Sequence, residues 1–116
     1  MALSAPTFKT PNTRENLGDR VVVIVDYTLD DSYQAGGYAV TPASLAMSEF
    51  SFVTVVISSD IGTTTYVPQF NHVDNTIQLF QQTDPADTGG ADVPLVEVAD
   101  NTDVSTVKVR VLAIGL

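Results

Sequence analysis

The clearest pattern in the chain is a nearly unbroken run of strand-forming residues from Arg20 to Leu29. Successive side chains of a strand point to opposite faces. One face of this run is then apolar throughout, and the other face becomes polar only from Asp26 onward. A strand with two largely apolar faces is typical of the middle of a covered sheet. We therefore expect residues 20–29 to be a central strand with most of both faces buried.

Apolar residues recur with a strand period in several later segments. Strands are predicted at residues 50–58, 66–70, 76–81, 93–98 and 105–114, and a short strand-like piece at residues 7–10. Residues 66–70 and 76–81 are expected to form a hairpin, and Pro68 indicates that its strand is at an edge or carries a bulge.

Two local patterns add detail to these elements. In the strand at residues 50–58, alternation places Val53, Val55 and Ile57 on one face and Phe50, Phe52 and Val56 on the other. Thr41 followed by Pro42 predicts a short helical turn, because threonine caps such a turn and proline suits its first position.

The order of these elements predicts the fold class. Gly, Pro, Asn and Asp residues separate about six to eight strands, and no helix longer than one turn is indicated. We expect an all-β protein, an antiparallel β-sandwich of jelly-roll-like form with one short helical turn. Residues 1–19 are interpreted as an extended N-terminal arm that lies on the domain or on a neighbour, or as a frayed terminus. Residues 20–116 are then the single sandwich domain.

Charge and composition exclude several classes of function. Fourteen acidic and five basic residues give a formal net charge of −9. Such a chain is a poor partner for nucleic acid or for an anionic membrane, because both require positive charge. The acidity suits solubility or a basic protein partner. No apolar run approaches the roughly 20 residues of a membrane span, no basic and apolar leader is present, and there are no cysteines.

Few residues suggest catalysis or cofactor binding. His72 is the single histidine and falls in the predicted hairpin turn, where an imidazole simply faces water. Asp84, Asp87 and Asp92 lack the spacing of an EF-hand, and aspartates also cap turns, so calcium in a loop stays an open alternative. The glycine pairs supply turns and do not precede a helix as phosphate loops do. We expect no enzymatic activity, no catalytic or metal-binding residue and no cofactor.

The last predicted strand suggests a contact with another subunit. Val107, Val109, Val111 and Ala113 form one apolar face, and the opposite face carries Lys108, Arg110, Leu112 and Ile114. Asp26 is a candidate cross-strand partner for the basic pair. The apolar end of that face suits burial against a second protein better than exposure to water. The candidate interface residues are Thr7, Phe8, Lys9 and Arg14 of the arm, with Leu112, Ile114 and Leu116 at the C-terminus.

Three segments of the chain, residues 23–45, 66–80 and 107–116, resemble small head structural proteins of tailed bacteriophages, the capsid decoration or cement proteins. The matching motifs are a D-S-Y-x-x-G-G turn at residues 31–37, a T-x-x-x-L turn at 41–45, a Y-x-P-x-F segment at 66–70 and a V-x-V-R-V-x-A-I-G tail at 107–115. The likeness covers most of the chain after residue 19, and its motifs are structural.

The resemblance implies a virion protein that binds the outer surface of a phage head and stabilises it by bridging capsid subunits. The expected partner is the major capsid protein, and the expected assembly is a homo-oligomer, with a trimer favoured. The expected location is the capsid surface after synthesis in the host cytoplasm. The alternative is a sandwich module of a fibre or other assembly that recognises a glycan or protein through the loops at residues 30–38 and 82–92.

Overall fold

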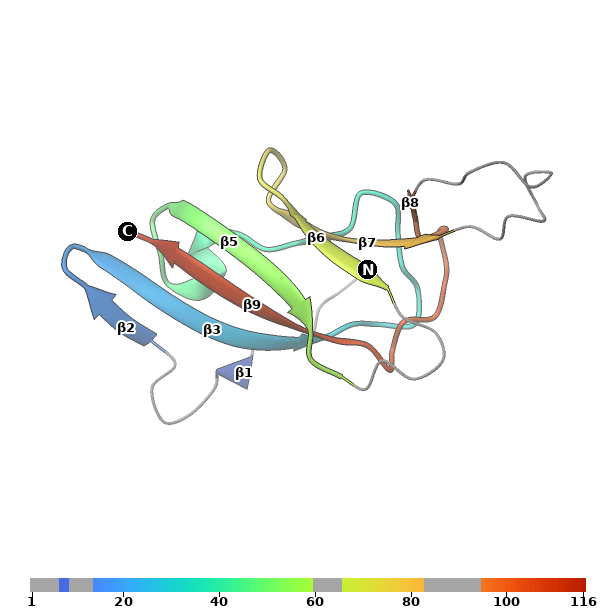
Figure 1. Cartoon of the computed structure of the whole chain (residues 1–116), viewed down its shortest axis with the longest axis horizontal. Coiled ribbons are helices and arrows are strands. Elements are labelled where there is room, and N and C mark those ends of the chain that lie inside the picture. Colours follow the sequence, from blue (N-terminus) through green and yellow to red (C-terminus); the bar gives the residue numbers. More distant parts are fainter. Residues whose placement is uncertain (1–6, 9–13, 60–65, 83–94) are drawn as a thin grey trace.

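The computed structural model describes residues 7–8, 14–59, 66–82 and 95–116, and it confirms the all-β, sandwich-like class. The strands are β1 (Thr7–Phe8), β2 (Arg14–Leu17), β3 (Arg20–Thr28), β4 (Tyr38–Ala39), β5 (Phe50–Ile57), β6 (Val67–Asn71), β7 (Thr76–Gln82), β8 (Leu95–Glu97) and β9 (Lys108–Gly115). The 3₁₀ turn η1 (Pro42–Leu45) lies between β4 and β5 (Figure 1). No helix in these four ranges has the length and apolar character needed to cross a bilayer.

The first sheet is built around β3 and β9. Its strand order is β1-β3-β9-β5, and β2 also pairs with β3, all antiparallel. The β3 strand therefore has neighbours at both edges, which confirms its predicted central place. The described parts of the N-terminal arm, β1 and β2, belong to this sheet, and a turn at Gly18 and Asp19 joins β2 to β3.

The second sheet contains the predicted hairpin. Its order is β4-β7-β6, with β8 also paired to β7. The strands β6 and β7 form the hairpin with Phe70 opposite Ile77, and Pro68 lies on β6 at the edge of the sheet, as expected. Most of the polar stretch expected as a loop at residues 82–92 lies outside the described residues.

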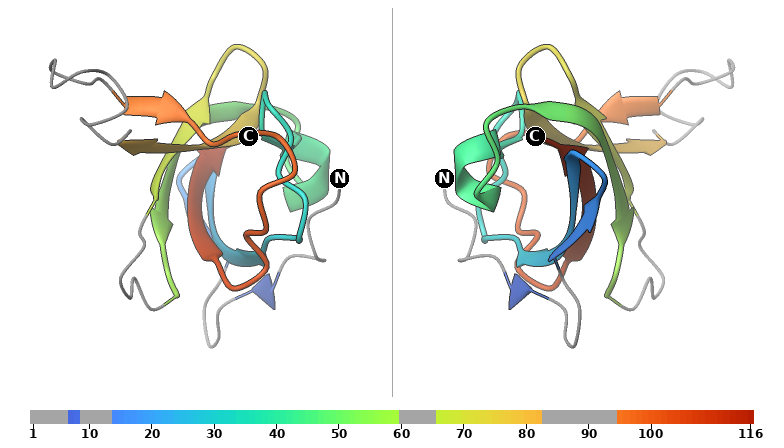
Figure 2. Two further views of the ribbon diagram at one scale, coloured as in Figure 1. Left: turned by 90° about the vertical axis from the view of Figure 1, so that its right-hand side faces the viewer. Right: turned by 90° about the vertical axis from the view of Figure 1, so that its left-hand side faces the viewer.

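The two sheets curve around one apolar core (Figure 2). Odd-numbered residues of β3 and β9 face inward, and Val23, Val25, Val109 and Val111 have no exposed surface. Ile77 and Leu79 of β7 are equally buried from the other side. Removal of this apolar surface from water is the main favourable term in folding.

Two expectations about individual strands are wrong. A β-bulge between Phe50 and Phe52 adds a residue to β5, so Phe50 turns inward and packs edge-on against Phe70, 5.9 Å between ring centroids. The final strand begins at Lys108, three residues later than predicted. The Val107 amide donates to the Val104 carbonyl oxygen, and the Asp103 carboxylate accepts from the Ser105 amide, which together bend the chain into a turn.

The helical turn follows the predicted capping chemistry. The hydroxyl of Thr41 accepts a hydrogen bond from the Ser44 amide at 3.4 Å, and Pro42 occupies the first helical position. The turn ends at Ala46 in the left-handed region, with φ of 58°. Leu45 is fully buried, so the turn closes one end of the core.

Candidate interaction surface

The loop between β3 and β4 is held by two buried tyrosines. The Tyr33 hydroxyl donates to Glu97 Oε2 at 2.6 Å and accepts from the Leu79 amide at 3.1 Å. The Tyr38 hydroxyl donates to Asp30 Oδ1 at 2.7 Å. Burial, reinforced by the hydrogen bond to the neighbouring carboxylate, raises the pKa of each tyrosine above its ordinary value.

The same loop explains the carboxylates and glycines around it. Glu97 Oε2 also accepts from the Gly36 amide at 2.8 Å and from Gln78 Nε2 at 3.2 Å. Gly37 has φ of 86°, and a Cβ atom there would lie 2.2 Å from the carbonyl oxygen of Ile77. The turn from Asp31 to Gly37, which carries part of the sequence resemblance, is therefore fixed in place by hydrogen bonds to the rest of the chain. The polar groups that form these bonds stabilise the fold.

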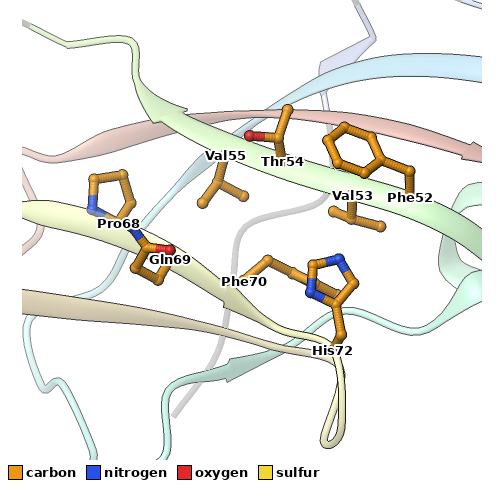
Figure 3. Close-up of a pocket in the computed structure, with 8 residues that line it drawn as sticks. All are labelled: Phe52, Val53, Thr54, Val55, Pro68, Gln69, Phe70 and His72. Atoms are coloured by element: carbon orange, nitrogen blue, oxygen red, sulfur yellow. The ribbon is translucent and has the colours of Figure 1, made fainter.

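His72 lies where the sequence placed it, at the hairpin between β6 and β7. The imidazole is exposed and packs edge-on against Phe70, 5.0 Å between centroids. It borders a hollow of about 240 Å³ between β5 and β6, the strands at which the two sheets meet. Figure 3 shows Phe52 and His72 at one end of this hollow and Pro68 and Gln69 at the other. His72 is the only ionisable group among the eight lining residues, so the hollow has no acid–base pair.

The described residues also contain no cluster of three or more histidine or acidic side chains placed to hold a metal ion. Asp84, Asp87 and Asp92, for which calcium is an alternative, lie outside the described ranges. The candidate binding sites of the described residues are therefore surfaces and not pockets.

One surface is unusual for a protein this acidic. The side of the first sheet that points away from the core, here called the outer face, is apolar over one half. Its apolar residues are Val22, Ile24, Phe52, Val56, Leu112 and Ile114, and its polar positions on β3, β5 and β9 are Arg20, Asp26, Thr28, Thr54, Lys108 and Arg110. Phe52 is 49% exposed and Val56 is 53% exposed. The expectation that most of both faces of β3 are buried is met on the core side, and the outer side is only partly buried.

An ion pair borders the apolar part of the outer face. Arg110 lies opposite Asp26 in the ladder and contacts it twice, with Nε 2.8 Å from Oδ1 and NH2 3.2 Å from Oδ2. This confirms Asp26 as the predicted cross-strand partner of Arg110. The hydrogen bond to Asp26 raises the pKa of the guanidinium group further, so Arg110 stays charged and oriented.

The structure places the predicted interface residues in three ways. Leu112 and Ile114 lie on the outer face, and Leu116 follows with 41% of its surface exposed. Thr7, Phe8 and Arg14 lie in strands paired with β3, and their side chains are outside the description, as is all of Lys9. Sequence reasoning did not group Ile24, Phe52 and Val56 with Leu112 and Ile114, beside which the sheet places them. The sequence shows how these residues alternate along their strands. It does not show that β3 and β5 lie on either side of β9.

Comparison with known proteins adds no relative. No family model matches the chain, and no curated protein or solved structure was found to be similar to it.

Proposed function

We propose that this protein is a structural component of a virion, a decoration protein that binds the outer surface of a phage head and bridges its capsid subunits. The observation that supports the proposal is the apolar outer face, which the described part of the chain leaves partly open to water. The sequence resemblance supplies the kind of assembly.

The stabilisation follows from linkage. A protein that binds assembled subunits and not separated ones raises the free energy needed to take the shell apart. Many weak contacts repeated over a symmetric particle add up, because each bound contact raises the effective concentration of the next. No chemical step is required, and the rigid strand framework serves to keep contact surfaces at a constant distance.

The binding test uses shells from the source of the sequence. Purified protein is mixed with expanded heads, with unexpanded heads and with free capsid subunits, and the bound fraction is measured by sedimentation. We expect saturable binding to expanded heads, a higher temperature of shell dissociation and little binding to free subunits. A protein that ignores all three, or that binds each equally, would contradict the proposal.

A matched pair of variants connects binding to the outer face. Phe52→Asp introduces a charge at the outer face, whereas Leu95→Asp changes a side chain of similar exposure, 49% against 52%, on β8 of the other sheet. We expect Phe52→Asp to weaken binding to heads by at least about tenfold, since a carboxylate in an apolar contact is costly. Leu95→Asp should bind as the wild type does. Equal effects of the two variants would show that binding to heads does not depend on the outer face.

A further inference from the structure

The tip of the hairpin between β6 and β7 presents an apolar side chain to solvent. Val73 is 90% exposed, and the tip projects beyond the strands of both sheets (Figure 1). The tip is also well ordered by local bonds, because Asn71 Oδ1 accepts from the amides of Val73 and Asp74 at 2.9 and 3.2 Å. A third bond joins the Asn75 amide to the Asn71 carbonyl oxygen at 2.8 Å. A projecting group that is already held in place loses little conformational entropy on binding.

The outer face contains a hollow that suits such a group. It has a volume of about 260 Å³ and is lined by Ile24, Thr54, Val56, Arg110 and Leu112. Apart from the guanidinium group and one hydroxyl, its lining is aliphatic. An apolar cavity of about 150 Å³ can hold a benzene molecule. The hollow therefore has room for the three side-chain carbons of one valine.

Charge on the two surfaces is complementary at Lys108, because Arg110 already pairs with Asp26 on the same face. The structure describes the side chains of three of the five basic residues, and all three, Arg20, Lys108 and Arg110, occupy outer-face positions of β3 and β9. Next to Val73 on the hairpin is the exposed carboxylate of Asp74. Consecutive Cα atoms are about 3.8 Å apart, and Lys108 lies two strand positions from Arg110, about 7 Å away. A valine seated in the hollow thus brings the neighbouring carboxylate within reach of Lys108, whose side chain is exposed.

We propose that the hollow of the outer face binds the hairpin tip of a second copy of this chain, with Val73 in the hollow and Asp74 facing Lys108. The occupant is a second copy because one chain carries both complementary surfaces, while its own Val73 stays exposed. The inference rests on the proposed function and divides the outer face, because Phe52 does not line the hollow and its side chain remains for contact with the head. The two patches differ, so the contact is head-to-tail and generates a ring if the rotation closes or an open chain if it does not.

Self-association of the full chain, with no capsid material present, tests the proposal. Sedimentation equilibrium at concentrations up to about 1 mM should detect a reversible oligomer. Val73→Ser, which removes the apolar group of the tip, and Val56→Asp, which places a carboxylate in the hollow, should each raise the dissociation constant at least about tenfold. Leu95→Ser, which changes an exposed leucine 52% open to solvent on β8, should leave the dissociation constant unchanged.

Mixing the two defective variants gives the sharpest outcome. Val73→Ser retains an intact hollow, and Val56→Asp retains an intact hairpin tip. Their mixture should form a one-to-one pair although each variant alone is monomeric, and that pair also shows that both variants are folded. A face-to-face contact between two outer faces cannot produce this rescue, because Val56→Asp would still spoil one side of it.

A charge exchange tests the orientation. Asp74→Lys and Lys108→Asp should each weaken association, and the double variant should recover most of the lost affinity because the opposite charges again face one another. Lack of recovery would overturn the assigned pairing of Asp74 with Lys108.

The failure of this inference differs from the failure of the proposed function. A monomer throughout the concentration range, or unchanged association of Val73→Ser, would overturn the hairpin contact even if the protein binds heads. Oligomers that require Val73 but ignore expanded heads would leave the contact standing and overturn the decoration role.

Discussion

Replacing Tyr33 with phenylalanine removes one oxygen atom from a buried side chain whose hydroxyl has two hydrogen bonds. Tyr33 has no exposed surface, and its ring packs edge-on against Tyr38 with 5.7 Å between centroids. Phenylalanine keeps that ring contact and the buried volume. The stability change therefore reports the hydroxyl group alone.

The magnitude follows from the two bonds of that hydroxyl. Its bond to Glu97 is charge-assisted, but Glu97 keeps donors from Gly36 and Gln78, so this loss is about 1 to 1.5 kcal/mol. The Leu79 amide loses the acceptor that it has at 3.1 Å in a buried position, which costs about 1.5 to 2 kcal/mol. We expect a total loss of about 3 kcal/mol in the free energy of unfolding.

Tyr38→Phe is the matched control. Its hydroxyl donates to the Asp30 carboxylate and also forms a hydrogen bond with the Asp30 backbone, and the carboxylate accepts from the Ser32 amide as well. Asp30 is only half-buried, whereas Leu79 is fully buried, so water can replace the lost bonds of Asp30 and the expected loss is about 1.5 kcal/mol. Urea unfolding followed by circular dichroism measures both variants, and at about 4 °C per kcal/mol the melting temperatures should fall by about 12 °C and about 6 °C. Equal losses would refute the reasoning, because they would mean that the Leu79 amide finds another partner.

Two further predictions concern the same loop. The free energy of unfolding should fall as the pH rises above about 10, because the unfolded chain then ionises its tyrosines while Tyr33 and Tyr38 are held neutral by their raised pKa values. Below that pH the two tyrosines contribute their full stabilisation. Urea midpoints that stay constant from pH 8 to pH 11 would contradict this prediction. Gly37→Ala should lower the free energy of unfolding by about 3 kcal/mol or more, since the new Cβ atom meets a backbone carbonyl oxygen of β7. Gly36 has a similar φ but open space around it, so Gly36→Ala should lower the free energy of unfolding by only about 1 to 2 kcal/mol in the same urea assay.

The strand predictions are correct where the alternation of side chains is visible within the segment itself. The alternation from Val21 to Tyr27 and from Val107 to Ala113 is an intrinsic property of the sequence, and any sheet that buries one side must use it. The hairpin and the capped helical turn depend on neighbours within a few residues, so their signals are also local. The pairing of Asp26 with Arg110 could be predicted because each is a charged residue on a strand face that also carries apolar residues.

The errors have the opposite origin. Phe50 faces the core because a bulge inserts one residue into β5, and nothing in the local pattern marks the extra residue. The two-residue strand β4 exists only through its partner β7, and its own sequence is too short to show a period. The roles of Tyr33 and Glu97 could not be predicted, because 64 residues separate them and only the folded chain brings their side chains together.

The amino-acid sequence by itself determined which side chains alternate, where turns interrupt them and that the chain is acidic, because these depend on neighbouring residues and on simple counting. Only the tertiary structure decided that β3, β9 and β5 lie side by side, and hence that their second faces merge into one apolar surface with basic groups around it. That surface is a sum over three distant segments, and the order of strands in a sheet is set by the packing of the whole core.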